Sequence, residues 1–400
     1  MLDRALTVIA AGLLVGAGPA AAGGSAGAAT TCTRHVAVTG SDTASGSATA
    51  PWATLAKGLT SVTAGDVLCV HAGRYAAPQV TLPPGTSTAP ITLEPAGDGP
   101  VVVIGATSLR RPEHWVLRGL EWTNPGGSKA IVTLAGGTGW TFEGNHLYDG
   151  GYAGLLVGRS STYGSPHRYT IRANVIHATS ASNLYHNPGR ESRGGLIERN
   201  LLFDAGSQNL KLGWGGTDAC TGTNYDSFGI GEVVVRYNTM HGAPQPLAVA
   251  EAGGDLPVLV HRNLVSGPLR THPVRIGNVE GCLRDNVSVV DNLAHGGTTF
   301  LEDFDDAPSI VAKAVDNVWP RDPAYDSTTS PDGFRPQDPV AQGYGRYAGT
   351  ASEPTSEPTS EPTSERTSER TTDSSSPSPA STRPGTGGGG GSGGGKGRKT

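Results

Sequence analysis

The feature that most constrains this chain is an Asn that recurs behind short β-type runs throughout its middle. Three of the copies read IRANVIHAT, IERNLLFDAG and VRYNTMHGA, and the full series is Asn145, Asn174, Asn200, Asn238, Asn263, Asn292 and Asn317. Most separations lie between 25 and 29 residues, while one of 38 indicates an insertion around Cys220 to Phe228. The segment WVLRGLEWT extends the series backwards, with Gly119 in the Asn position.

A period of about 25 residues with β-branched runs and Gly-rich corners is typical of one coil of a β-solenoid. Helical repeats would need apolar stripes at a 3.6-residue period, and the sequence has none. Coils of a parallel β-helix stack about 4.8 Å apart, so a buried Asn at one corner can hydrogen-bond to its copies above and below. We therefore interpret the Asn series as structural and predict an all-β chain, a right-handed parallel β-helix.

Composition agrees with this fold and argues against one class of partner. The 59 Gly and 29 Pro residues favour turns over long helices. A formal net charge of -5 provides no general attraction to phosphates, so we do not expect nucleic acid to bind. We expect a monomer.

The two ends of the chain differ from its middle. Residues 1–22 combine Arg4, an apolar stretch from Ala5 to Val15 and small residues, which is typical of a secretory signal peptide. This apolar stretch is too short to span a membrane. The rest of the sequence contains no apolar stretch of greater length. Residues 30–349 form the predicted β-helix domain. Residues 350–400 are low in apolar residues and predict a disordered tail, either a spacer or a weak electrostatic wall-binding segment.

Four cysteines in a chain expected to be secreted predict two disulfides. We favour pairing Cys32 with Cys69 and Cys220 with Cys282 over the other two connectivities, because each pair lies within one part of the chain. A zinc site is disfavoured because no CxxC or HxxxH spacing occurs.

The segment from Val36 to Leu82 reads VAVTGSDTASGSATAPWATLAKGLTSVTAGDVLCVHAGRYAAPQVTL. It resembles the opening of secreted β-helix polysaccharide lyases and their relatives: a first strand, a GSD turn, a PW-T-L segment that begins a short capping helix, and a GD-V-V-AG-Y strand. The resemblance implies a helix around Leu55 to Leu59 over the open end of the solenoid. The closing segment DPAYDSTTSPDGFRPQDPVAQGYGRYA resembles those proteins too, so the likeness extends to Ala348. This fold carries lyases, hydrolases, epimerases and adhesins, so the reaction must be argued from a site.

A second β-run follows each Asn and supplies a common register. Because side chains alternate along a strand, Leu184, Leu210, Leu247 and Val274 should point inward. The outward column is then Leu156, Tyr185, Lys211, Ala248 and Arg275, with Phe300 or Glu302 next. Lys211 and Arg275 would lie two coils, or roughly 10 Å, apart.

Lys and Arg in one groove suit an anionic sugar chain, whose carboxylates a guanidinium can bind in bidentate fashion. The chemistry that uses these groups is β-elimination across a uronic acid linkage. We expect Lys211 to act as the base, Arg275 to neutralise the carboxylate, and Tyr185 or His186 to act as an auxiliary acid or binding group. The expected substrate-binding residues are His186, Glu251 and Trp214.

The resemblance also implies Ca²⁺ at the substrate carboxylate, and the acidic run Glu302, Asp303, Asp305 and Asp306 could ligate it or form a solvated edge. Two other functions stay open. A glycoside hydrolase would need two carboxylates, which Glu251, Glu302 and Asp303 could supply, but the Asn-Thr-Asp and Gly-His-Gly motifs of β-helix polygalacturonases and the aspartate-rich calcium cluster of pectate lyases are missing. The third function is a non-catalytic carbohydrate-binding or surface solenoid.

Overall fold

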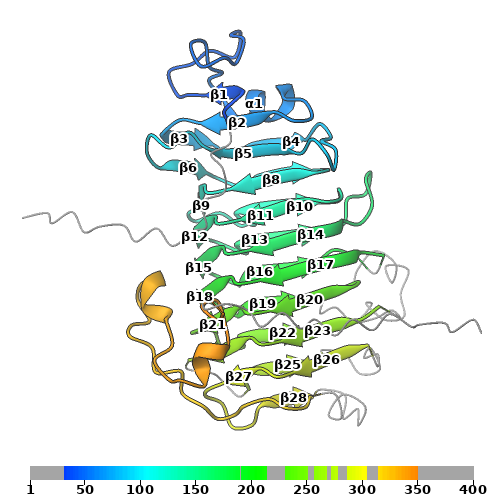
Figure 1. The fold of residues 1–400 in the computed structure, drawn as a ribbon, viewed down its shortest axis with the longest axis vertical. Coiled ribbons are helices and arrows are strands. Elements are labelled where there is room, and N and C mark those ends of the chain that lie inside the picture. Colours follow the sequence, from blue (N-terminus) through cyan, green and yellow to red (C-terminus); the bar gives the residue numbers. More distant parts are fainter. Residues whose placement is uncertain are drawn as a thin grey trace, which may run out of the picture. The chain divides into compact units, whose positions relative to one another are not determined.

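The computed structural model describes residues 31–189, 191–213, 230–250, 256–267, 272–277, 286–303 and 314–349. In this part the chain winds through three parallel sheets in turn, which confirms the predicted all-β parallel β-helix (Figure 1). We call these sheets A, B and C in the order in which each coil visits them. The predicted signal peptide and tail, and Cys220 and Cys282, lie outside the described residues.

Sheet A has ten strands, which are β1 (Arg34–Val36), β2 (Val67–Val70), β5 (Ile91–Pro95), β8 (Trp115–Arg118), β11 (Thr141–Glu143), β14 (His167–Arg172), β17 (Arg193–Glu198), β20 (Val233–Arg236), β23 (Val258–His261) and β26 (Val287–Val290). Sheet B has nine, which are β3 (Gly73–Ala76), β6 (Val101–Ile104), β9 (Glu121–Asn124), β12 (His146–Gly150), β15 (Val175–Thr179), β18 (Leu201–Ala205), β21 (Thr239–His241), β24 (Leu264–Ser266) and β27 (Leu293–Ala294). Sheet C also has nine, which are β4 (Gln79–Thr81), β7 (Thr107–Arg110), β10 (Val132–Ala135), β13 (Leu155–Gly158), β16 (Ser182–Asn187), β19 (Gln208–Leu212), β22 (Leu247–Val249), β25 (Val274–Ile276) and β28 (Leu301–Asp303).

The Asn series forms the predicted ladder at the corner between sheets A and B. Asn174 illustrates the pattern: its side-chain Nδ2 donates to Asn200 Oδ1 at 2.9 Å and its backbone N–H donates to the same oxygen at 3.0 Å. The same contacts continue from Asn145 to Asn317, and the ladder residues from Asn145 to Asn292 are at most 1% exposed. The ladder therefore supplies partners to buried backbone groups that the bend would otherwise leave unsatisfied.

The residue before each ladder Asn adopts a left-handed conformation, as Ala173 (φ 55°) and Arg199 (φ 54°) show. Such a conformation costs a non-Gly residue roughly 1–2 kcal/mol, which the amide hydrogen bonds offset. Gly119 (φ 73°) takes this left-handed place, because its N–H donates to Glu143 as the next coil's Gly144 does to Arg172. The prediction that Gly119 fills the Asn position was wrong by one residue. Leu120 fills it, and its N–H donates to Asn145 Oδ1.

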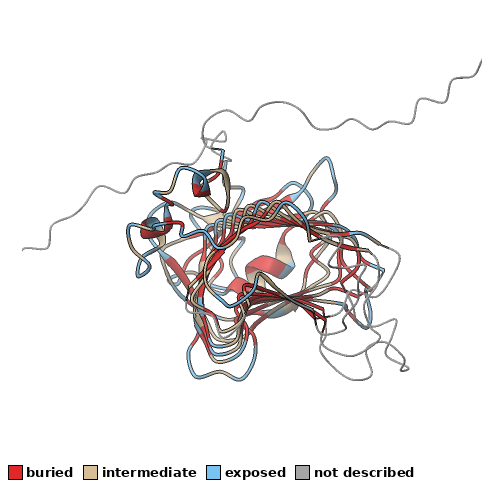
Figure 2. Cartoon of the chain, turned by 90° about the horizontal axis from the view of Figure 1, so that it is seen from below, coloured by how far each residue is buried: buried red, intermediate tan, exposed pale blue. Residues whose placement is uncertain are grey.

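The interior of the solenoid is filled by aliphatic columns and, in the N-terminal coils, by large aromatic side chains. On sheet C the predicted inward residues Leu184, Leu210, Leu247 and Val274 are all fully buried. The end-on view in Figure 2 shows buried residues lining the inner side of the coils. Stacking equivalent positions places like side chains in contact, so an alternating strand pattern is enough to build this core.

The N-terminal end is closed by α1 (Leu55–Ser61), which confirms the predicted capping helix. Thr54 caps the helix by accepting a hydrogen bond from the Lys57 N–H at 3.2 Å, and Asp42 of the GSD turn accepts from the Thr54 N–H and hydroxyl. Leu55 and Leu59 are buried against the first coils. The Cys32–Cys69 disulfide, with Cα atoms 5.6 Å apart, is present as predicted and fixes the first strand to β2.

A C-terminal segment, residues 322–349, folds back over the outer face of sheet B and carries the 3-10 helices η1 (Pro331–Phe334) and η2 (Ala341–Gly343). It is the orange segment beside β18 and β21 in Figure 1. Phe334 is fully buried against Leu201 and Phe203, and Tyr344 packs near Leu264 and Leu293. No helix in the described part of the chain is long and apolar enough to cross a bilayer.

Candidate functional site

The predicted outward column exists on sheet C with the predicted register. Parallel pairing joins Leu156 to Tyr185, Tyr185 to Lys211, and Lys211 to Ala248. It continues from Ala248 to Arg275 and then to Glu302 rather than Phe300. We call Tyr185, Lys211, Ala248 and Arg275 the sheet C column.

Lys211 is the half-buried centre of this column. Its Nζ lies 4.9 Å from the centre of the Tyr185 ring, a cation–π contact. Burial lowers the pKa of the Lys211 ammonium, and the positive charge of Arg275 lowers that pKa further. No carboxylate forms an ion pair with Lys211 among the described residues. Burial and the charge of Arg275 thus favour the neutral amine, the form that can accept a proton, while the Tyr185 ring contacts the ammonium form.

Arg275 is half-buried two strands beyond Lys211. The methyl side chain of Ala248 occupies the position between the two cations. Strand spacing puts the Cα atoms of Lys211 and Arg275 roughly 10 Å apart, with a small residue between them. A carboxylated sugar ring can therefore approach both cations from the same side.

Tyr185 lies in the column but beneath its surface. The side chain is only 5% exposed and packs with Ala130, Ala153 and Leu156. Its hydroxyl oxygen is buried as well. Tyr185 therefore does not present its hydroxyl to a bound ligand. Its ring instead packs against the Lys211 ammonium.

His186 does not belong to the outward face, which corrects the expectation that it binds substrate. It pairs with Val157 and Leu212, residues whose side chains point inward, and it is fully buried. The Tyr169 hydroxyl hydrogen-bonds to its Nε2. Burial lowers the pKa of His186 to about 3, so the imidazole is a neutral core group.

The remaining predicted site residues are only partly covered by the structure. Trp214, Glu251, Asp305 and Asp306 lie outside the described residues. β28 carries the backbone of Glu302 and Asp303, aligned with Arg275 and Ile276. No group of three His, Cys, Asp or Glu side chains suited to a metal occurs in the described ranges. Calcium binding stays a prediction.

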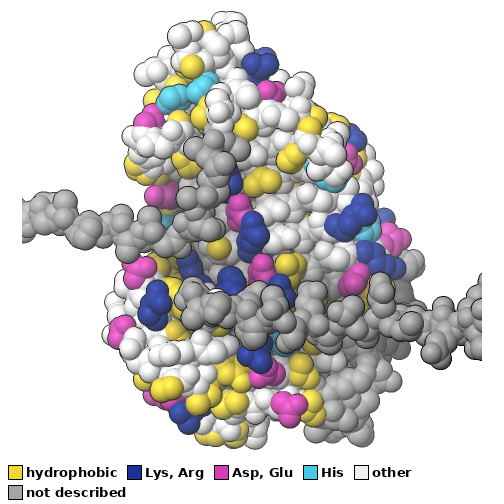
Figure 3. Space-filling model, in the orientation of Figure 1, with side chains coloured by type: hydrophobic (Ala, Val, Ile, Leu, Met, Phe, Trp, Pro, Cys, Tyr) yellow, Lys and Arg dark blue, Asp and Glu magenta, His cyan; other side chains and the backbone are white. Residues whose placement is uncertain are grey.

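Charge elsewhere on the molecule is mixed. On the face shown in Figure 3, basic and acidic side chains are interspersed without a broad area of one sign. Attraction of a polyanion would therefore depend on local positive groups such as the sheet C column.

Sequence reasoning missed a second group of polar side chains, on the outer face of sheet B. His146, His177 and His241 line a hollow there together with residues of the C-terminal segment. The alternation of β12, β15 and β21 could have placed these histidines outward, but no sequence pattern indicates that the C-terminal segment returns to cover them.

The fold and site together define a parallel β-helix protein with a basic column on one sheet. No protein-family model matches the sequence, and no curated protein sequence matches it. Similar solved structures include pectate lyase Pel9A, with a TM-score of 0.47 and 13% identity over 74% of this chain and 83% of that one. A rhamnogalacturonan lyase has a TM-score of 0.46 and 13% identity over 72% and 87% of the two chains. An alginate lyase from Paenibacillus sp. str. FPU-7 has a TM-score of 0.42 and 14% identity over 63% and 96%.

The parallel β-solenoid of this chain is established by its own strand pairing. A lacto-N-biosidase from Eubacterium ramulus is similar as well, with a TM-score of 0.41 and 12% identity over 71% of this chain and 66% of that one. With identities of 12–14% and TM-scores of 0.41–0.47, these likenesses carry no argument about function, and the reaction has to be argued from the residues of this chain.

Proposed function

We propose that the protein is a polysaccharide lyase that cleaves a uronate-containing polymer by β-elimination at the sheet C column. The observation that carries this proposal is the position of Lys211, half-buried on the ring of Tyr185 and two strands from Arg275, with its pKa lowered. A base and a cation for the carboxylate are the two groups that this reaction requires.

In the proposed reaction Arg275 binds the carboxylate of the uronate and stabilises the negative charge that develops next to C5. The neutral amine of Lys211 accepts the C5 proton. The electron pair of that C–H bond forms the C4–C5 double bond, and the C4–O bond breaks with its electron pair leaving on oxygen. Because the Tyr185 hydroxyl is buried, the leaving oxygen takes its proton from solvent.

The contribution of Tyr185 is to position the base. Its ring faces the ammonium and its packing removes water from one side of Lys211. Both effects act through Lys211, so a Tyr185 variant should alter the pH dependence of turnover. Tyr185→Phe, which keeps the ring, should retain most of the activity, and Tyr185→Ala should lose it.

The test is incubation of the protein with pectate, alginate and glycosaminoglycans, with and without Ca²⁺, while the ultraviolet absorbance of an unsaturated uronate is followed. We expect absorbance to rise with at least one polyanion. The comparison with and without Ca²⁺ tests the calcium prediction. New reducing ends without absorbance would indicate a hydrolase. If no polyanion gave a product, the lyase proposal would fail and the non-catalytic binding solenoid would be favoured.

A further inference from the structure

The hollow on sheet B is built from two separate parts of the chain. Its inner wall is the outer face of β12, β15, β18 and β21, with His146, His177 and His241. Its other wall is the C-terminal segment at Thr328 and Thr329. The hollow measures about 510 Å³, within the range of small-molecule sites. We call it the histidine pocket.

The histidines of this pocket present neutral hydrogen-bonding nitrogens. His146 Nε2 and His177 Nε2 lie 2.9 Å apart, and the stacked rings have their centres 5.1 Å apart, so this contact uses the Nε2 of each ring and not its Nδ1. His241 Nδ1 contacts the Ser266 hydroxyl at 3.1 Å, so this contact does not use the Nε2 of the same ring. Burial, helped by the neighbouring His146, lowers the pKa of His177 to about 4, and burial also lowers the pKa values of His146 and His241. All three are neutral near pH 7.

The pocket floor is rigid and apolar. The Phe203 ring stacks on His177 with ring centres 4.5 Å apart and contacts the tilted ring of Phe334 with centres 4.9 Å apart. The wall is held in place as well, because the Tyr347 hydroxyl donates to the Pro331 carbonyl at 2.7 Å. The pocket is thus already formed, which reduces the entropy cost of binding a ligand.

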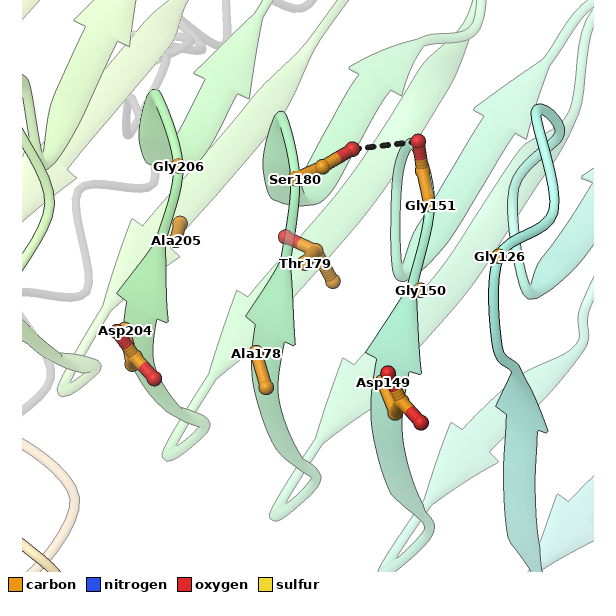
Figure 4. A pocket seen from close by; sticks show the side chains of 10 residues that line it. All are labelled: Gly126, Asp149, Gly150, Gly151, Ala178, Thr179, Ser180, Asp204, Ala205 and Gly206. Atoms are coloured by element: carbon orange, nitrogen blue, oxygen red, sulfur yellow. Dashed lines mark hydrogen bonds between the residues drawn. The ribbon is translucent and has the colours of Figure 1, made fainter.

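The charge of the pocket is opposite to that of the sheet C column. Its lining includes one carboxylate, Asp204, and no Lys or Arg. Asp204 also lines a neighbouring groove of about 420 Å³ at the corner between sheets B and C. Figure 4 shows Asp149, Ala178 and Asp204 on successive coils of that groove, with their side chains projecting to the same side. An anionic sugar would be repelled along this path.

We propose that the histidine pocket binds a neutral oligosaccharide that reaches from His177 to His241. These residues are two coils, or roughly 10 Å, apart, which is longer than one sugar ring. A hydroxyl group both donates and accepts hydrogen bonds, as do neutral imidazoles and threonine hydroxyls. The site is separate from the sheet C column and does not depend on lyase chemistry.

The test is titration of the full chain with cellobiose, xylobiose, lactose and mannobiose while the NMR signals of the histidine rings are followed. At least one sugar should cause saturable shifts of the His177 and His241 signals. Digalacturonate should not shift them. The Lys211→Ala variant should bind the neutral sugar as the natural chain does, so this proposal and the lyase proposal can fail independently.

Two variants locate the site. His177→Ala should weaken binding at least about tenfold, because it removes one hydrogen-bonding ring. Thr329→Trp fills the pocket from an exposed position and should abolish binding without altering the core. His261→Ala, a half-buried histidine on sheet A, is the matched control and should bind normally. Absence of shifts with every neutral sugar, or binding retained in both pocket variants, would overturn the proposal.

Discussion

Two charged columns run along this solenoid, and they are arranged in opposite ways. On sheet A, acidic and basic residues alternate from coil to coil: Arg118 lies 2.5 Å from Glu94 and 3.7 Å from Glu143, Arg172 lies 2.6 Å from Glu143, and Arg236 lies 2.9 Å from Glu198. We call this the sheet A ladder. On sheet C, Lys211 and Arg275 have like charges with Ala248 between them.

The stacking distance is the same on both sheets, so the difference lies in sequence alone. In the ladder each charge is compensated by the next coil, which favours folding by modest amounts. In the sheet C column the two cations repel each other, and this repulsion contributes to the lowered pKa of Lys211. The ladder therefore pairs opposite charges from coil to coil, whereas the column places two like charges on the same face of the sheet.

The largest effect should come from removing the base of the column. Lys211→Ala should lower kcat on the polyuronate substrate by about 10²–10⁴-fold, the usual contribution of a general base. The melting temperature should change little, because the side chain is half-buried on the outer face. Lys129→Ala, which removes an exposed lysine away from the column, should keep full activity. Near-normal turnover of the Lys211 variant would show that another group takes the proton.

The next effect concerns the repulsion within the column. Arg275→Gln removes the cation that lowers the pKa of Lys211, so that pKa should rise. Because the neutral amine is the active form, the rising limb of the pH–activity profile should move to higher pH. At neutral pH kcat/KM should fall by about 10–100-fold, partly through a higher KM, since the carboxylate loses its bidentate partner.

The control for that profile is Arg110→Gln, which removes an arginine from the same sheet outside the column. Its Nε donates to the Thr81 hydroxyl at 3.2 Å. The pH profile should stay in place. An unshifted profile in Arg275→Gln would mean that the two cations of the column do not interact.

A smaller effect should follow from giving the ladder the charge pattern of the column. Glu143→Lys places three cations in a row, from Arg118 through position 143 to Arg172. The free energy of unfolding, measured with urea, should fall by about 1–2 kcal/mol through two lost ion pairs and new repulsion. Lyase activity should be unchanged, and a loss of activity equal to that of Lys211→Ala would contradict the division of roles.

The smallest effect is that of salt. High ionic strength screens exposed charges, so the destabilisation by Glu143→Lys should shrink by a fraction of a kcal/mol. The KM for a polyuronate should rise in parallel, because the column attracts its ligand through charge. A KM independent of salt would remove the electrostatic basis of the sheet C column.

The repeat allowed most of the fold to be predicted, because a buried Asn at a fixed place in every coil has a structural reason to recur. The same repeat located the outward column but left its continuation open between Phe300 and Glu302, of which the strand pairing gives Glu302. The assignment of Gly119 to the Asn position was one residue too early. A glycine in this repeat takes the left-handed position that precedes the ladder Asn. The alternation that places Leu212 inward also applies to His186, so its burial was predictable from the sequence.

The burial of Tyr185 and the histidine pocket depend on packing contacts that the repeat does not predict. Tyr185 points outward by alternation, yet Ala130 and Ala153 from earlier coils cover it. The histidine pocket exists because the C-terminal segment returns to sheet B, where Phe334 packs on Phe203. Such contacts between distant segments follow from the folded arrangement and leave no periodic signal in the sequence.

The central claim is that the sheet C column catalyses elimination, and the most direct test is the mass of the product formed in water labelled with heavy oxygen. Cleavage of a polyuronate by this protein should yield an oligosaccharide with an unsaturated end and no label at the new reducing end. The Lys211→Ala variant should form almost none of it. A saturated, labelled product, or no product from any polyuronate, would contradict the account.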